Sequence, residues 1–245
     1  MMQDLKGKHA VVTGGGRGIG AAIVKRFIAE GAAGVAILDY DFPSAQATAA
    51  LYPEHAIALA CDISDQSQVH ACIDQVLQRF GSIEILVNNA GITRDALFQN
   101  MTDSDWHKVI ATNLTGSYHC LQKVIPIMLK QSYGRIINIS SSSAHGNVGQ
   151  ANYSASKAAL LGLTKTLARE FAAHGITVNA VSPCNIETEM LTAIPEKLLA
   201  SIKRLTPIRR LGTPDELAAA VSFLASDDSR YITGIELPVN GGMFT

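Results

Sequence analysis

Short runs of apolar and β-branched residues alternate with helical patterns along most of this chain, and this alternation limits the folds that it can adopt. The seven runs are His9 to Val12, Gly34 to Leu38, Ala56 to Ala60, Ile83 to Val87, Arg135 to Ile139, Thr177 to Val181 and Ile235 to Val239. Between the first two runs, Ile19, Ile23 and Phe27 recur at helical spacing. Such runs joined by helices are typical of βαβ units, whose strands form a parallel sheet buried on both faces. We therefore expect an α/β fold with seven strands.

Length and composition indicate one domain that acts on a small molecule. A chain of 245 residues, 47% of them hydrophobic, can build one large core, so we expect a single domain over 1–245. The formal charge of −1, with both signs mixed, excludes the basic surface typical of binding to nucleic acid or to a membrane. No apolar run has the length of a membrane-spanning helix, and we expect a cytoplasmic protein.

One long stretch, residues 185–210, lacks a clear strand and contains Pro195 and Pro207. Segments of this length within a compact domain are usually lids or binding loops, so we expect substrate contacts there. The four cysteines, Cys61, Cys72, Cys120 and Cys184, show neither CxxC spacing nor a nearby histidine cluster. We expect reduced thiols, with no metal site and no disulfide framework.

A glycine-rich turn, Thr13 to Gly20, follows the first expected strand and opens the first expected helix. Glycines allow a tight turn and bring backbone N–H groups close to a pyrophosphate, which the positive end of the helix dipole also favours. The alternative is a strand-to-helix corner that uses glycine for geometry alone. The turn predicts a dinucleotide site, and its cofactor-binding residues are Gly14, Arg17, Gly18, Ile19 and Gly20.

Asp39 stands at the end of the second expected strand, nineteen residues after Gly20. A carboxylate at this place accepts hydrogen bonds from the ribose hydroxyls of an adenosine, and it repels a 2′-phosphate. Asp39 therefore favours NAD over NADP. Arg17 opposes this preference, because its guanidinium could pair with a 2′-phosphate, so NADP is not excluded.

Tyr153 and Lys157 are one helical turn apart, so their side chains lie on the same helix face. A phenol with an ordinary pKa near 10 exchanges protons poorly at neutral pH, and a nearby cation lowers that pKa. The pair therefore predicts a general acid or base. On its own this spacing also occurs on ordinary solvated helices.

Several further motifs occur in a characteristic order. They are Thr13 to Gly20, Asp62-Ile63, Asn88 to Gly91, Asn113, Asn138 to Ser141, Tyr153 to Lys157, Pro183 with Ile186 and Thr188, and Asn240 to Gly242. Together they resemble the classical short-chain dehydrogenase/reductase family over essentially the full chain. This resemblance implies a Rossmann-type, doubly wound, seven-stranded parallel sheet in a three-layer α/β/α domain. It also implies a nicotinamide dinucleotide across the carboxyl ends of the strands and, usually, a homotetramer.

The resemblance assigns roles to individual residues. Tyr153 is the general acid or base, Lys157 also binds the nicotinamide ribose, and a serine at a strand end polarises the substrate oxygen. Asn113 resembles the family asparagine in a locally distorted helix, which holds a water that links Lys157 to solvent. The cofactor contacts are Asp62 and Ile63 beside the adenine, Asn89, Ala90 and Gly91 on the adenosine side, and Pro183, Ile186 and Thr188 near the carboxamide.

Two positions depart from the family pattern. The usual spacing of thirteen residues before Tyr153 selects Ser140 as the catalytic serine, whereas the strand-end motif selects Ser141. We choose Ser141, because a surface loop absorbs a deletion more easily than a buried strand does. Cys184 stands where the family has glycine, and it either narrows the nicotinamide pocket or simply fills space.

In finer detail the chain resembles reductases of 3-oxoacyl thioesters, whose acyl group is carried by acyl carrier protein or coenzyme A. The resemblance lies in Gly91 to Asp95, Gly149 to Tyr153 and Leu167 to Asn179. Reductases that act on the acidic carrier protein tend to present arginines where this chain has Ser132 and His174. Nearby basic residues are Lys130, Arg135 and Arg169.

Two other functions stay open. One is an NAD-dependent dehydrogenase of a small polyol, hydroxy acid or other secondary alcohol, which the preference for NAD favours. The other is a dinucleotide-binding sensor without catalytic activity. Such sensors commonly lack the tyrosine or the lysine, and this chain has both Tyr153 and Lys157.

Overall fold

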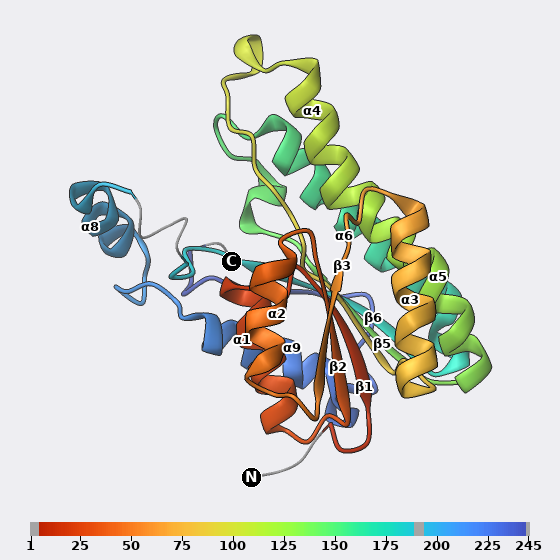
Figure 1. The fold of residues 1–245 in the computed structure, drawn as a ribbon. Helices are drawn as coiled ribbons and strands as arrows, with labels where there is room; N and C mark the ends of the chain where they lie inside the picture. The colour runs from red at the N-terminus through yellow and green to blue at the C-terminus, as the bar shows by residue number, and fades with distance from the viewer. Residues whose placement is uncertain (1–4, 189–193, 244–245) are drawn as a thin grey trace.

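The computed structural model describes residues 5–188 and 194–243 of the chain, and it contains one seven-stranded sheet (Figure 1). The strands are β1 (His9–Thr13), β2 (Gly34–Asp39), β3 (Ala56–Ala60), β4 (Ile85–Asn88), β5 (Gly134–Ile139), β6 (Ile176–Pro183) and β7 (Glu236–Val239). All are parallel, in the order β3-β2-β1-β4-β5-β6-β7. The predicted doubly wound parallel sheet is confirmed, and each predicted strand is present.

Helices cover both faces of this sheet (Figure 1). On one face lie α1 (Gly18–Ala29), α2 (Phe42–Ala50) and α9 (Pro214–Ala225), and on the other lie α3 (Gln66–Phe80), α5 (Gly116–Gln131) and α6 (Ala151–Phe171). Helix α4 (Asp103–Ile110) extends beyond the sheet and continues into α5. The predicted three-layer α/β/α arrangement is therefore confirmed.

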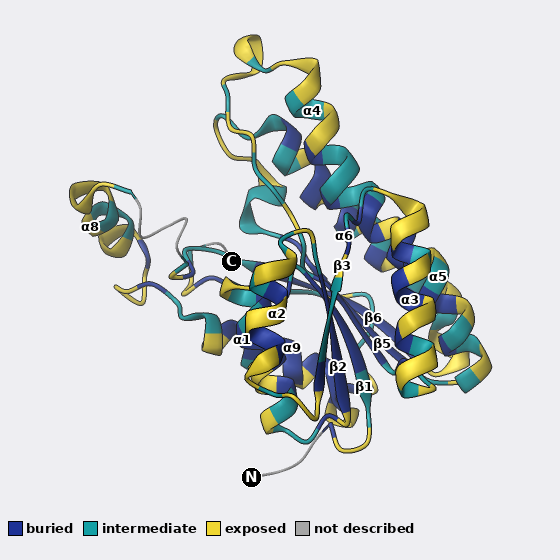
Figure 2. Ribbon diagram, viewed as in Figure 1, coloured by how far each residue is buried: buried dark blue, intermediate teal, exposed yellow. Residues whose placement is uncertain are grey.

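The hydrophobic core has two parts, one on each side of the sheet. Val12 of β1 packs on the side of Phe27, and its neighbour Val11 packs on the side of Ile73. All four side chains are fully buried. Because successive strand residues point to opposite faces, a strand covered on both sides needs an unbroken apolar run, which is the pattern seen in the sequence. Figure 2 shows the buried strands between the two helix layers.

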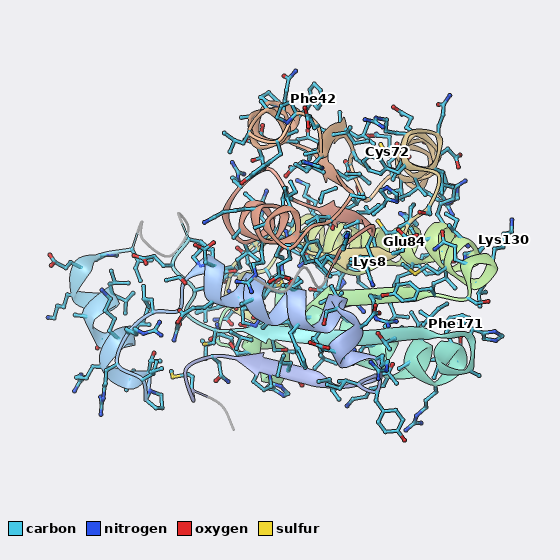
Figure 3. The ribbon with its side chains drawn as sticks, turned by 90° about the horizontal axis from the view of Figure 1, so that it is seen from below. Lys8, Phe42, Cys72, Glu84, Lys130 and Phe171 are labelled. Carbon is cyan, nitrogen blue, oxygen red and sulfur yellow. The ribbon has the colours of Figure 1, made fainter. Side chains whose placement is uncertain are left out.

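The amino ends of the strands meet at the bottom of the molecule. There the Glu84 carboxylate accepts a 2.7 Å hydrogen bond from the backbone N–H of His9, and Figure 3 shows Glu84 beside Lys8 in a view from below. The same view separates Phe42, on α2, from Phe171, at the end of α6. The contact between Glu84 and His9 joins two strands at the amino edge of the sheet. Ligands of open α/β sheets bind at the opposite, carboxyl edge.

Part of the segment expected to act as a lid forms α8 (Glu196–Leu205), which stands apart from the two helix layers (Figure 1). None of the α8 residues is buried. Residues 189–193 of that segment lie outside the described residues, and the lid function stays a prediction. Across the described part of the chain, no helix is both long and apolar enough to cross a membrane.

Candidate active site

The sequence-predicted site residues gather at the carboxyl edge of the sheet because the strands are parallel and in register. Asn88 at the end of β4 pairs with Asn138 of β5, and Ile139 pairs with Val181 of β6. The loops that follow these strands therefore begin at the same level. The order of strands reverses between β1 and β4, and ligands of open α/β sheets bind at such a reversal.

Tyr153 and Lys157 lie together on α6. The Lys157 Nζ atom is 5.6 Å from the centre of the Tyr153 ring, and it donates a 2.7 Å hydrogen bond to the carbonyl oxygen of Ile139. Lys157 is only 3% exposed. Gly91 packs beside this amine, since a Cβ atom at Gly91 would lie 3.4 Å from Nζ and 3.3 Å from the side-chain oxygen of Asn113. The missing side chain at Gly91 thus leaves room for the amine.

Burial dominates the titration of both groups. It raises the pKa of Tyr153, which a hydrogen bond with Ser141 lowers and the nearby Asp95 carboxylate raises further. Burial also lowers the pKa of Lys157 to about 8. The expectation that Lys157 lowers the pKa of Tyr153 is thus not met, because the cost of desolvating a phenolate outweighs the favourable interactions around it. The phenol is protonated at neutral pH, which is the state of a proton donor.

The two candidate serines have different environments. The Ser140 hydroxyl is buried and donates a 2.9 Å hydrogen bond to the carbonyl oxygen of Lys157. The Ser141 hydroxyl interacts with the Tyr153 phenol and lowers its pKa, and it accepts a 3.1 Å hydrogen bond from the N–H of Ser143. Ser140 thus ties β5 to α6, whereas Ser141 shares the site with Tyr153. The geometry favours Ser141, as the strand-end motif does.

A chain of buried polar side chains fixes α6 against the sheet. The Asn88 amide donates to the Asn138 side-chain oxygen at 2.8 Å, and the Asn138 amide donates to the Thr164 hydroxyl at 2.9 Å. Asn88, Asn138 and Thr164 are all buried. The sequence motifs contained both asparagines, but no role was assigned to them. An asparagine within an otherwise apolar, doubly covered strand is the signal that could have revealed this network, because a buried amide needs partners.

Asn113 lies in a turn of π-helix, η2 (Ala111–Thr115), between α4 and α5. The local helix distortion implied by the resemblance is therefore present. Asn113 is fully buried, and its side chain accepts from the N–H of Ile92 at 2.8 Å and donates to the carbonyl oxygen of Ile92 at 3.0 Å. It also donates to the Ser156 hydroxyl at 3.1 Å. Asn113 thus joins the helix to the loop after β4 and to α6.

The glycine turn has the close packing that a phosphate-binding turn needs. A Cβ atom on Gly20 would lie 2.0 Å from the carbonyl oxygen of Gly14, and one on Gly16 would lie 2.8 Å from the backbone nitrogen of Ala45. Gly14 and Gly18 both have positive φ angles, of 63° and 55°. Side chains would therefore push the turn away from α1 and α2. The turn leads directly into α1, whose first N–H groups favour an anion, so it fits a dinucleotide pyrophosphate.

Asn89 holds this turn in place. Its side-chain amide donates 2.9 Å hydrogen bonds to the carbonyl oxygens of both Thr13 and Gly14. The Thr13 hydroxyl in turn accepts from the N–H groups of Asn89 and Ala90, both at 3.0 Å. The loop after β4 therefore supports the turn after β1. The predicted contact of Asn89 and Ala90 with the adenosine side of the cofactor stays a prediction.

Asp39 lies against the same turn. One of its carboxylate oxygens accepts a 2.9 Å hydrogen bond from the N–H of Gly16, and the other accepts one of 3.0 Å from the N–H of Asp41. The Arg17 guanidinium is exposed and pairs with the Asp41 carboxylate at 3.4 Å. Asp39 is therefore held against the turn that fits a pyrophosphate, and its contact with an adenosine ribose stays a prediction.

The remaining predicted cofactor contacts lie on the loops after β3 and β6. The Asp62 carboxylate accepts from the N–H and the hydroxyl of Ser64, and Ile63 is 4% exposed and packs against Gly116. On the opposite side, the methyl group of Thr188 lies 4.0 Å from the position of a Cβ atom on Gly18. The structure thus brings the segment after β6 against the glycine turn.

Behind that segment, Cys184 and Ile186 line a cavity of about 130 Å³ together with residues of the chain beyond α8 and of β7. The backbone N–H of Cys184, which follows Pro183, donates a 3.2 Å hydrogen bond to the carbonyl oxygen of Val239. Cys184 is partly buried and carries a free thiol. The Cys184 side chain thus lines this cavity, and its effect on a nicotinamide pocket stays a prediction.

Gln150 and Asp95 were given no individual role in the sequence analysis, although Asp95 lies close enough to Tyr153 to affect its pKa. The Gln150 amide donates to the Asp95 carboxylate at 2.9 Å, and its oxygen accepts from the Ser143 hydroxyl at 3.0 Å. These bonds connect the loop after β4 to the turn η3 (Ser142–His145) that follows Ser141. They stabilise the position of Ser141 opposite Tyr153.

Arg135, one of the basic residues named near Ser132 and His174, is buried and is not part of a basic docking surface. Its side chain is 4% exposed, pairs with Asp227 at 3.0 Å and lies 4.3 Å from the centre of the Tyr133 ring. A guanidinium in a buried strand needs such partners. Lys130 and Arg169 are exposed, as are Ser132 and His174.

The sequence matches known proteins over nearly its full length. Residues 14–244 match the model of a family described as enoyl-(acyl carrier protein) reductase. The chain is 43% identical over 241 residues to the 3-oxoacyl-[acyl-carrier-protein] reductase FabG of Haemophilus influenzae, which covers 98% of this chain and 99% of that protein. It is 45% identical over 243 residues to the enzyme of that name from Staphylococcus aureus, covering 97% and 98%. The Thermotoga maritima protein of the same name is 42% identical over 242 residues, covering 98% of each chain.

Proposed function

The chain belongs to the short-chain dehydrogenase/reductase family, and from this premise we propose that it reduces the 3-oxo group of an acyl thioester with NADH. The observation that carries the proposal is the meeting of the Ser141 hydroxyl and the protonated Tyr153 phenol beside Lys157, at the sheet edge that also carries the glycine turn. Two neighbouring O–H groups suit a carbonyl oxygen, which accepts two hydrogen bonds.

Each of the chain's own site residues has a separate role in the reduction. A bound nicotinamide dinucleotide supplies the hydride that the carbonyl carbon receives. Ser141 donates a hydrogen bond to the carbonyl oxygen, and Tyr153 gives that oxygen its proton. Lys157 stabilises the phenolate that remains, because an ammonium in a buried site acts strongly on a nearby negative charge. A water held at Asn113, connecting Lys157 to solvent for the return of the proton, is part of this proposal.

The preference for NADH is proposed from the Asp39 carboxylate. Both of its oxygens accept hydrogen bonds from backbone N–H groups around the glycine turn, so its charge is fixed at the ribose position. A 2′-phosphate placed there would meet a like charge, whereas a 2′-hydroxyl can donate to it.

The thioester substrate is proposed from the relatives, whose names state that they act on 3-oxoacyl groups of acyl carrier protein. Ser132 and His174 offer less positive charge to an acidic carrier than arginines would. Together with Asp39, this observation favours a second candidate function, which is the oxidation of a small secondary alcohol by NAD. We further propose a homotetramer that acts in the cytoplasm, and light scattering of the purified protein tests its assembly.

The test is a comparison of substrates and cofactors on one enzyme preparation. A 3-oxobutyryl group is supplied on coenzyme A and on acyl carrier protein, with NADH or NADPH, and secondary alcohols are supplied with NAD. Absorbance of the reduced nicotinamide reports turnover. We expect thioester reduction with a higher kcat/KM for NADH, and the Tyr153→Phe variant serves as a blank for contaminating reductases. Turnover of alcohols alone would replace the proposal with the second candidate, and cofactor binding without any turnover would indicate a sensor.

A further inference from the structure

The glycine turn, β2 and the start of α2 are connected by a closed set of contacts. Gly16 donates its N–H to one oxygen of Asp39, and Asp41 donates its N–H to the other. The Asp41 side chain then pairs with the guanidinium of Arg17, at 3.4 Å, next to Gly16 in the turn. Asp41 is therefore connected to the turn that would hold the pyrophosphate in two ways, through Asp39 and through Arg17.

Asp41 is fixed in this position by a second role. It is the N-cap of α2, where its side chain accepts from the N–H of Ser44 at 3.3 Å and from the Ser44 hydroxyl at 2.8 Å. These hydrogen bonds lower the pKa of Asp41, so it carries its charge at neutral pH. The carboxylate cannot follow Arg17 if the guanidinium moves, because it is anchored to the first turn of the helix.

We propose that Asp41 is a specificity-determining residue, which holds the Arg17 guanidinium against the end of β2 and keeps it from binding the 2′-phosphate of NADPH. This inference rests on the proposed use of a nicotinamide dinucleotide. A free guanidinium in this turn is well suited to a phosphate, since its N–H groups can donate to two phosphate oxygens. In this structure the guanidinium pairs with Asp41, and Asp39 is bound to the neighbouring residue Gly16. The positive charge of Arg17 is thus offset by these carboxylates, which reduces its attraction for a phosphate.

Restraint of Arg17 by Asp41 can be distinguished from simple repulsion between the Asp41 carboxylate and the 2′-phosphate. If Asp41 only repelled the phosphate, its neutralisation would help NADPH to the same extent with or without Arg17. If Asp41 restrains Arg17, the gain requires the guanidinium. The two explanations are separated by measuring the same substitution in two backgrounds.

Asp41→Asn is the informative change, because asparagine is as good an N-cap as aspartate and the start of α2 is preserved. The matched control is Asp215→Asn. Asp215 forms an exposed ion pair of the same kind with Lys25 of α1, at 3.1 Å, but it belongs to α9 and is not among the residues of the cofactor turn. The control removes an equal charge and one ion pair of α1.

The experiment is calorimetric titration of the full-length protein with NADPH and with NADH, which needs no turnover. We expect Asp41→Asn to raise the ratio of NADPH affinity to NADH affinity by about three- to tenfold, the effect of one partly screened charge interaction. In an Arg17→Gln background the same substitution raises the ratio less than twofold, and Asp215→Asn changes it less than twofold. An equal gain in both backgrounds, or no gain in either, overturns the proposal. If the unsubstituted protein binds neither dinucleotide, the proposed function itself fails, and the first titration shows it.

Discussion

The Lys157 ammonium donates a 2.7 Å hydrogen bond to the carbonyl oxygen of Ile139, the last residue of β5. One residue further along, the Ser140 hydroxyl donates to the carbonyl oxygen of Lys157 itself. Helix α6 and strand β5 are thus joined by two reciprocal bonds at the level of the site. The position of Ser141 relative to Tyr153 follows from this connection, because Ser141 is the next residue of the chain.

Lys157→Met should change how stability depends on pH. The pKa of Lys157 in the folded protein, about 8, lies below its ordinary value of 10.5, so the unfolded chain binds more protons between these two values. The free energy of unfolding therefore rises with pH through this window, by about 3 kcal/mol from this residue, and the full penalty of burying the charge applies below pH 8. The Lys157→Met variant has no amine at this position, so its free energy of unfolding should not show this rise with pH. Urea denaturation at pH 7.5 and at pH 10 measures it.

Lys165→Met is the control for that measurement, because Lys165 is an exposed lysine of the same helix. It should follow the pH dependence of the unsubstituted protein. Parallel stability curves for Lys157→Met and the unsubstituted protein would contradict the depressed pKa of this buried amine.

Tyr153→Phe keeps the ring and removes only the hydroxyl. We expect turnover to fall by about a hundredfold or more, while the affinity for NADH changes little, since a phenol that donates a proton acts mainly in the transition state. Stopped-flow kinetics and a cofactor titration on the same preparation separate the two effects. Loss of NADH binding to the same extent as turnover would show that the phenol serves binding instead.

Ser141→Ala and Ser140→Ala should have different consequences. Loss of the Ser141 hydroxyl removes a donor to the substrate oxygen, and we expect kcat to fall by about 10²- to 10³-fold with little change in stability. Loss of the Ser140 hydroxyl leaves the Lys157 carbonyl without its partner, which should reduce stability by about 1 to 3 kcal/mol. Kinetics and thermal denaturation of both variants test this. If the Ser140 change alone abolished turnover in a stable protein, the strand-end alignment would be wrong.

Asp39→Asn should relax the selection against NADPH. Asparagine keeps an acceptor for the N–H of Gly16 but loses the charge that faces a 2′-phosphate, so we expect the kcat/KM ratio of NADPH to NADH to rise about tenfold or more. Asp39→Ala would relax it as well, while also releasing the Gly16 N–H. An unchanged ratio in Asp39→Asn would assign the preference to Arg17 or to the backbone of the turn.

The layers of the fold could be predicted from sequence because burial on both faces leaves a clear signal. The run Val35 to Leu38 is fully buried, and a strand with this environment must be apolar at every position. The common location of Tyr153, Lys157 and the glycine turn was predicted from the family resemblance, and the parallel strands explain it because they bring their carboxyl ends to one edge. The spacing of thirteen residues before Tyr153 did not identify the catalytic serine. A loop that is one residue shorter changes this spacing without changing the position of either serine in β5 and the residues that follow it.

Electrostatic details could not be predicted in the same way. The i, i+4 spacing of Tyr153 and Lys157 places them together, but the sign of a pKa shift depends on desolvation, which only the packed structure shows. Arg135 illustrates the same limit, since its place at the start of a predicted strand does not identify Asp227 and Tyr133 as the partners of its guanidinium. The contact of Arg17 with Asp41 likewise joins two loops that are separate in sequence.

The π-helical turn at Ala111–Thr115 carries a constraint on how this chain can vary. A π-helical turn takes up one residue more than an α-helical turn, so α4 and α5 each keep their own face against the rest of the molecule while the backbone at Asn113 departs from regular geometry. Loss of one residue here would restore a regular helix and withdraw the Asn113 side chain from Ile92 and Ser156, whereas Val124 and Met128 of α5 would stay buried against the sheet. The extra residue between α4 and α5 therefore serves the position of the Asn113 amide and not the packing of α5.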